Sequence, residues 1–219
     1  MPGVGQRKSY DYPRRGWVRI IALVNHTIDT RFGGVAANFI RELNHKIPKE
    51  DQFFQESRLS SFRKGGFILP VTLRGIAHIV DIPFSAPPGM PCQRFTTAEI
   101  MEVAYDRLHP RVTEIDPKPR LAIAIDKRLA QRGQTLEDLA QGSGVDLYRV
   151  LRVYCLGGWG SLSAETEDGR RAMDEFYRIS AWLDGSKVGA QWFYEEVHGA
   201  PYPAPHSDTP RAAENGYPA

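Results

Sequence analysis

Two short stretches of the chain concentrate side chains whose types and spacing suit contact with nucleic acid. The first holds Gln55, Ser57, Arg58, Ser60, Ser61, Arg63 and Lys64, and the second holds Gln134, Thr135, Tyr148, Arg149 and Arg152, with Leu147 beside them. Arginine can donate to guanine or to phosphate, glutamine can pair with adenine, and hydroxyl groups bind phosphate. The two stretches therefore predict contacts to DNA.

Residues for other chemistry do not fall into recognisable patterns. The six histidines and the two cysteines, Cys92 and Cys155, lack metal-ligand spacing, and the Gly157–Gly160 run is not followed by the Lys-Ser/Thr pair of a phosphate loop. No nucleophile, base and acid stand in a known motif. We predict no catalytic residue, no metal and no cofactor, and hence a protein that is not an enzyme.

The formal charge of the chain is unevenly distributed along its 219 residues. The total is +2, but the residues before Gly160 carry +7 and those from Gly160 onward carry −5. This asymmetry favours an anionic partner for the basic part. No apolar run approaches the roughly 20 residues of a membrane span, and no apolar segment follows the basic N-terminus. We therefore expect no membrane partner and a cytoplasmic, nucleoid-associated protein.

Apolar residues recur at helical spacings of three and four through most of the chain, and alternating period-2 runs are scarce. This pattern predicts an all-α fold of two small helical modules joined by a proline-rich segment that contains a short helix. The expected divisions are a disordered basic arm over 1–16, a first module over 17–86, a linker over 87–119 with a helix at about 97–109, a second module with an aromatic extension over 120–197, and a disordered tail over 198–219.

The stretch from Thr135 to Gly157 has the pattern of two helices joined by a tight turn. Leu136, Leu139 and Ala140 lie on one helical face, Gly144 suits a left-handed turn, and Val145, Val150 and Val153 fit the buried face of a second helix. This stretch resembles the helix-turn-helix of the lambda-repressor-like (XRE or Cro-type) family. Residues 120–132 and 167–183 resemble the family's first and closing helices. The resemblance implies that the helix over 146–156 enters the major groove.

The first module looks like a divergent copy of the same pattern. Leu59 and Phe62 take the places of Val150 and Val153, and a helix over 35–46 precedes a longer turn. This module is similar to the EspR-type regulators of mycobacteria. The basic arm, with Arg7, Lys8, Arg14 and Arg15, is interpreted either as a minor-groove contact or as a solvated tail.

Together these features predict a sequence-specific transcriptional regulator, such as a repressor of phage, mobile-element or chromosomal origin, that binds double-stranded DNA through two helix-turn-helix modules. A homodimer would read a longer palindrome. The alternative from a different class is a protein-interaction module, such as an antitoxin or an adaptor of the transcription machinery. Its partner surface would contain Trp182, Trp192 and Phe193.

Overall fold

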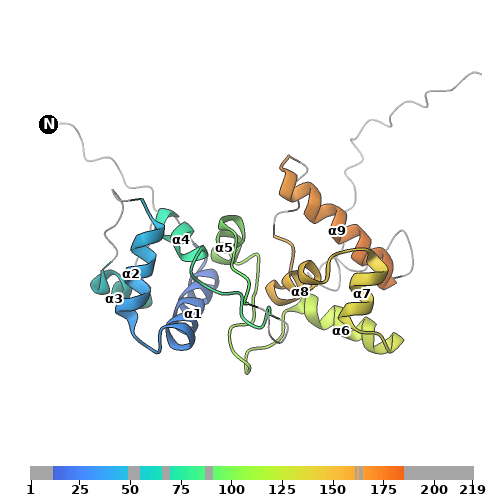
Figure 1. The fold of residues 1–219 in the computed structure, drawn as a ribbon, viewed down its shortest axis with the longest axis horizontal. Coiled ribbons are helices and arrows are strands. Elements are labelled where there is room, and N and C mark those ends of the chain that lie inside the picture. Colours follow the sequence, from blue (N-terminus) through green and yellow to red (C-terminus); the bar gives the residue numbers. More distant parts are fainter. Residues whose placement is uncertain are drawn as a thin grey trace, which may run out of the picture.

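The computed structural model describes residues 12–48, 55–65, 70–86, 91–160, 162 and 165–184, and this part of the chain is helical (Figure 1). Its helices are α1 (Arg14–Arg31), α2 (Ala36–Lys46), α3 (Glu56–Arg63), α4 (Pro70–Ala77), α5 (Thr97–Ala104), α6 (Arg120–Arg132), α7 (Leu136–Ser143), α8 (Leu147–Leu156) and α9 (Glu167–Asp184). Among the described residues, extended pairing is limited to one isolated antiparallel bridge between Asp81 and Arg94. The predicted all-α fold is confirmed.

Helices α1 to α5 surround the first of two hydrophobic cores. The apolar stripe of α1 contributes Ile20, Leu23 and Val24, which are fully buried against side chains of α2, α4 and α5. Helix α1 begins at Arg14, so the last three residues of the predicted disordered arm are helical instead. Pro13, at the N-cap with φ −54°, already has the backbone angle that a helix start requires.

Helix α5 packs into this first core, although the sequence placed it in the connecting segment. Ile100, Val103 and Ala104 are fully buried there. Contact with α1 is so close that a Cβ on Gly16 would lie 2.0 Å from the carbonyl oxygen of Ala104. Thr96 caps α5 and forms a capping box with Glu99. The helix ends at Ala104, five residues earlier than expected.

Helices α6 to α9 form the second core, in the other half of Figure 1. Leu121, Ile125 and Leu139 meet Val150, Val153 and Ile179 there. Gly144 ends α7 with φ 66°, as the pattern predicted for the tight turn. A left-handed residue at this position lets the chain reverse direction within a few residues.

The two cores meet at the C-terminal end of α8. Cys155 and Leu156 belong to α8 but are buried in the first core, and Tyr154 packs against both cores. The backbone N–H of His109 donates to the carbonyl of Leu156 at 3.1 Å. Helix α8 therefore fixes the second half of the molecule onto the first. Among the described helices, none combines the length and hydropathy that crossing a bilayer requires.

Candidate nucleic-acid interface

Helix α3 carries the first stretch of predicted DNA-binding residues, and it is anchored by two apolar side chains. Leu59 and Phe62 are 2% and 1% exposed, and the Phe62 ring meets the edge of Trp17 with 4.6 Å between ring centroids. Because these residues are three apart, they hold one face of the short helix inward. The predicted residues all lie on exposed positions, namely Gln55, Ser57, Arg58, Ser60, Ser61, Arg63 and Lys64.

The cations of α3 are available to a ligand to different degrees. Arg58 and Lys64 form no ion pair with any described residue, whereas the Nε of Arg63 donates to Asn25 Oδ1 at 2.8 Å. Glu56 is the one acid in the first turn. The surface of α3 is thus polar, rich in hydroxyl groups and net positive, which matches the donors that phosphates and base edges accept.

Helix α8, the corresponding helix of the second half, has a different environment. Asp146 caps it and accepts hydrogen bonds from the backbone N–H groups of Tyr148 and Arg149 at 2.9 and 3.3 Å. Val150 and Val153 are buried, as predicted from the spacing. Leu147 is half-buried and packs against the second core. The sequence predicted that Leu147 points outward, and this prediction is wrong because the side chain packs against the second core.

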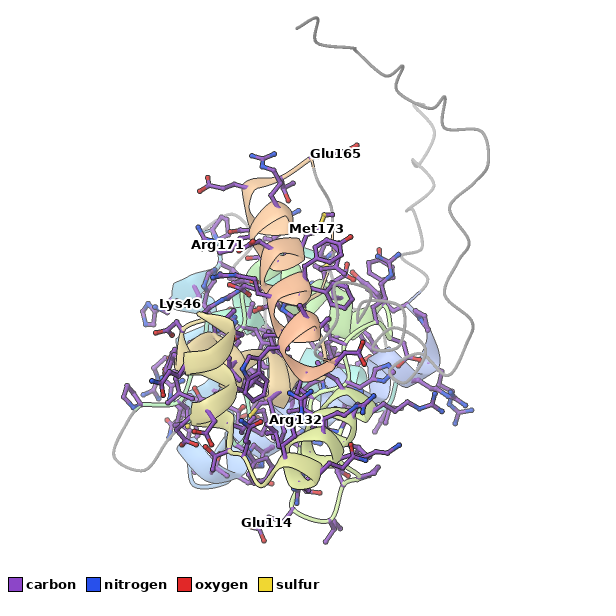
Figure 2. The ribbon with its side chains drawn as sticks, turned by 90° about the vertical axis from the view of Figure 1, so that its right-hand side faces the viewer. Lys46, Glu114, Arg132, Glu165, Arg171 and Met173 are labelled. Atoms are coloured by element: carbon purple, nitrogen blue, oxygen red, sulfur yellow. The ribbon has the colours of Figure 1, made fainter. Side chains whose placement is uncertain are left out.

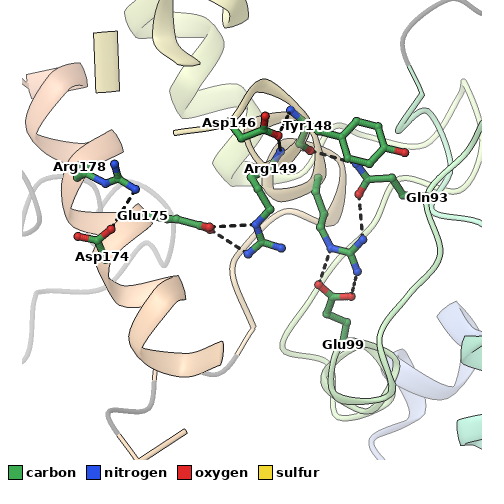
Figure 3. A network of polar contacts seen from close by, with 9 residues as sticks. Gln93, Glu99, Asp146, Tyr148, Arg149, Asp174, Glu175 and Arg178 are labelled. Atoms are coloured by element: carbon green, nitrogen blue, oxygen red, sulfur yellow. Dashed lines mark hydrogen bonds and ion pairs between the residues drawn. The ribbon is translucent and has the colours of Figure 1, made fainter. Parts of the chain in front are cut away.

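The two arginines of α8 form ion pairs within the molecule (Figure 3). Arg149 donates through Nε and Nη2 to the two oxygens of Glu175 at 3.0 and 2.9 Å, and the Glu175 side chain is only 5% exposed. These hydrogen bonds raise the pKa of the Arg149 guanidinium. Arg149 is therefore committed to α9, where its charge offsets that of a buried carboxylate.

Arg152 is committed to the first half of the molecule. Its Nε donates to Glu99 Oε1 at 2.8 Å, its Nη2 donates to Glu99 Oε2, and its Nη1 donates to Gln93 Oε1 at 2.9 Å. The side chains of Arg152 and Glu99 are 11% and 14% exposed. The sequence placed Arg152 on the outward face of α8, and this is corrected, because the segment that leads into α5 covers that face.

Tyr148 extends the same contact. Its hydroxyl donates to the carbonyl of Pro91 at 3.2 Å, and its own backbone carbonyl accepts a hydrogen bond from the Gln93 amide at 3.1 Å. Figure 3 shows Tyr148, Gln93 and Glu99 close together at the side of α8. Tyr148, Arg149 and Arg152, the α8 side chains expected to contact DNA, are thus all bound to other parts of the same chain.

The remaining two predicted residues lie at the start of α7. Thr135 is exposed and forms a capping box with Asp138, and Glu137 lies in the same first turn. Two carboxylates already offset the positive end of this helix dipole, so the site is poorly suited to a phosphate. Gln134 is half-buried, and its Oε1 is buried without a hydrogen-bond partner.

The residues proposed for a protein partner are described only in part. Trp182 is half-buried near the end of α9 and packs so closely on Gly142 that a Cβ there would lie 1.9 Å from its Nε1. Arg132, the last residue of α6, is labelled near the lower end of α9 in Figure 2. Its guanidinium donates to the carbonyls of Trp182 and Leu183 at 2.6 and 2.5 Å. Trp192 and Phe193 lie outside the described residues.

The buried thiol of Cys155 and the potential metal-ligating side chains are the remaining groups that could take part in chemistry. Burial raises the pKa of the Cys155 thiol to about 11, and the thiol donates to the carbonyl of Phe84 at 3.0 Å. Within the described ranges, no group of three or more His, Cys, Asp or Glu side chains is placed to hold a metal ion.

Sequence reasoning missed the carboxylates that bind the two arginines. Glu175 lies three residues after Ala172 and four before Ile179, both buried, so its position on the inner face of α9 was readable as a buried acid in need of a cation. Glu99 has the spacing of a helix-capping residue, which gives no sign of its ion pair with Arg152. No protein-family model, curated protein or solved structure matches the chain.

Proposed function

We propose that this protein is a sequence-specific transcriptional regulator, such as a repressor, that binds double-stranded DNA with α3 as its reading helix. The observation that carries the proposal is the exposed face of α3, where Gln55, Arg58 and Lys64 accompany three serines while only Leu59 and Phe62 are buried. A helix anchored on one side and lined with such donors on the other suits the major groove. Such a protein would act on the nucleoid in the cytoplasm.

The charge distribution supports the first half as the DNA-binding one. Residues 12–86 contain eleven Lys and Arg against six Asp and Glu, whereas residues 120–184 contain nine against ten. Phosphate neutralisation by basic side chains supplies most of the non-specific affinity for DNA. The second half is therefore proposed as a rigid companion of the first, held by α8. A homodimer would double the number of reading helices.

A protein-interaction role, as in an antitoxin or an adaptor of the transcription machinery, is the second candidate. The contacts of Arg149, Arg152 and Tyr148 favour it, because they use a helix-turn-helix pattern for protein packing. In that case α3 would have no sequence preference for DNA. The partner would bind beside Trp182, where α9 ends.

Selection from a pool of randomised duplexes, followed by fluorescence anisotropy on the enriched site, tests the DNA proposal. We expect Arg58→Ala to weaken binding to that site by about 1–3 kcal/mol and to relax the preference at one base position. The matched control is Arg74→Ala, which removes an exposed arginine from α4. The logarithm of the affinity should fall with the logarithm of the salt concentration at about −0.9 per phosphate contact. If no sequence is enriched and Arg58→Ala behaves as the control, the DNA proposal is refuted and a protein partner is favoured.

A further inference from the structure

A groove of about 850 Å³ lies between the two halves of the molecule. It is lined by one side of α1 from Arg15 to Ala22, by the first turn of α6 and by connecting residues between 106 and 119. Its arginine and lysine side chains are Arg15, Arg19, Arg107, Lys118 and Arg120, and its acids are Asp106 and Asp116. A volume of this size is typical of ligand sites, but a lining so rich in cations is not typical of sites for neutral ligands.

The two acids of the groove are occupied by donors of the groove itself. The Asp106 carboxylate lies 3.0 Å from His109 Nε2. The Asp116 carboxylate accepts the backbone N–H groups of Val112 and Thr113 at 3.1 and 2.9 Å. Arg107 and Lys118 form ion pairs with Glu102 and Asp126 outside the lining, so the three remaining arginines exceed the two acids of the groove.

Three arginines of the groove still have donors to offer. The side chains of Arg15 and Arg120 are exposed and make no hydrogen bond or ion pair with a described residue. Arg19 is half-buried: its Nη1 donates to the carbonyl of Pro110 at 3.0 Å, while its Nε is buried without a hydrogen-bond partner. An unpartnered guanidinium donor is costly unless a ligand accepts from it.

The groove is bordered by the start of α6, at Pro119 and Arg120, and by Arg15 near the start of α1. Helices α1 and α6 both begin after a proline, lack a side-chain cap and have no acid in the first turn. Their first backbone N–H groups therefore remain unsatisfied within the helix, and each helix end carries partial positive charge. Helix α7, with its capping box and two acids, shows the opposite arrangement in the same molecule. An anion in the groove would meet both helix ends and the free arginines together.

We propose that this groove binds phosphate groups, either those of a small polyphosphorylated ligand or those of a DNA backbone. The shared chemistry is a multiply charged phosphate held by Arg15 and Arg19 of α1 and by Arg120 of α6. Because α1 belongs to the first half and α6 to the second, an occupant bridges them. This proposal does not depend on α3 as a reading helix.

Isothermal titration of the full chain with inorganic tripolyphosphate tests the site directly. We expect Arg15→Gln and Arg120→Gln each to weaken binding by about tenfold, which is a typical loss for one charge-assisted contact. Both residues are exposed, so the variants should melt like the parent. Arg74→Gln, an exposed arginine of α4 outside the groove, is the matched control and should bind as the parent does.

Duplex DNA of scrambled sequence distinguishes the two phosphate sources. Tripolyphosphate binding that the groove variants weaken assigns the site to a small ligand. If tripolyphosphate does not bind, but the double variant weakens every duplex equally, the phosphates are those of DNA. If the double variant binds both probes like the parent, the proposal is overturned. Arg58→Ala reports separately on α3, because it changes the sequence preference and leaves tripolyphosphate binding unaltered.

Discussion

Replacing Arg152 with methionine isolates the contact that joins α8 to the first half of the molecule. The substitution keeps most of the side-chain volume but removes three hydrogen bonds, two to Glu99 and one to Gln93. With the Glu99 side chain 14% exposed, its carboxylate would be left with little solvent to stabilise its charge. Breaking a buried pair by removing one partner costs about 3–5 kcal/mol, and partial solvent access places the expected loss near about 3 kcal/mol.

A double-mutant cycle separates the ion pair from the other role of Glu99. Its Oε2 accepts the backbone N–H of Thr96 at 2.7 Å in the capping box, and glutamine preserves that bond. Glu99→Gln therefore keeps the cap but removes the charge, and it places an NH2 donor where Oε1 accepts from Arg152 Nε. We expect a coupling energy of about 2 kcal/mol between Arg152→Met and Glu99→Gln. The free energies of unfolding are measured by urea denaturation with circular dichroism.

An exposed pair on α9 supplies the control. Arg171 lies 3.6 Å from Glu167, with side chains 56% and 83% exposed, so Arg171→Met should cost less than about 0.5 kcal/mol. A loss for Arg152→Met no larger than this control, or a coupling energy near zero, would refute the reasoning. If α3 is the reading helix as proposed, affinity for the selected DNA site should stay within about twofold of the parent at temperatures where the variant is folded, because Arg152 is held by Glu99 and Gln93.

The remaining predictions concern Gly16, the two cysteines and Thr135. Gly16→Ala places a Cβ about 2.0 Å from the Ala104 carbonyl oxygen, so it should push α1 from α5 and lower stability by about 1–3 kcal/mol; an unchanged melting temperature contradicts that close approach. At pH 8 the exposed Cys92 should react with a thiol reagent in the native protein and Cys155 only in urea, and two fast thiols in the native state would exclude the buried position. Because burial raises the pKa of Cys155 from 9.0 to about 11, its contribution to stability is present below pH 9 and declines as the pH rises above it, as melting curves across that range would register. Thr135→Ala should lower stability by about 1 kcal/mol, because α7 loses its cap, and it should leave DNA affinity unchanged. Weaker DNA binding by this variant would instead indicate that Thr135 contacts a phosphate.

The helices were predictable because their signals are local. The capping box at Thr96 and the left-handed Gly144 depend on residues within one or two turns. The apolar spacing that defines α1 or α6 likewise repeats every three or four positions, so a single sequence suffices to identify the helical faces. The helical character of Arg14 and Arg15 was missed because proline and glycine neighbours resemble a flexible arm, whereas packing of Gly16 on α5 holds the helix start in place.

The sequence by itself determined the helical character of the described residues, the start of the capped helix α5, and a polar face on α3 supported by Leu59 and Phe62. Tertiary structure decided which arginines are free to meet a ligand. Arg149 and Arg152 find their carboxylates 26 and 53 residues away, so no local pattern pairs them. The groove proposed for phosphate has the same origin, since Arg15 and Arg120 line one groove only when the two halves have packed together. Ion pairing depends on distance in space, and only the packing of the two cores sets that distance.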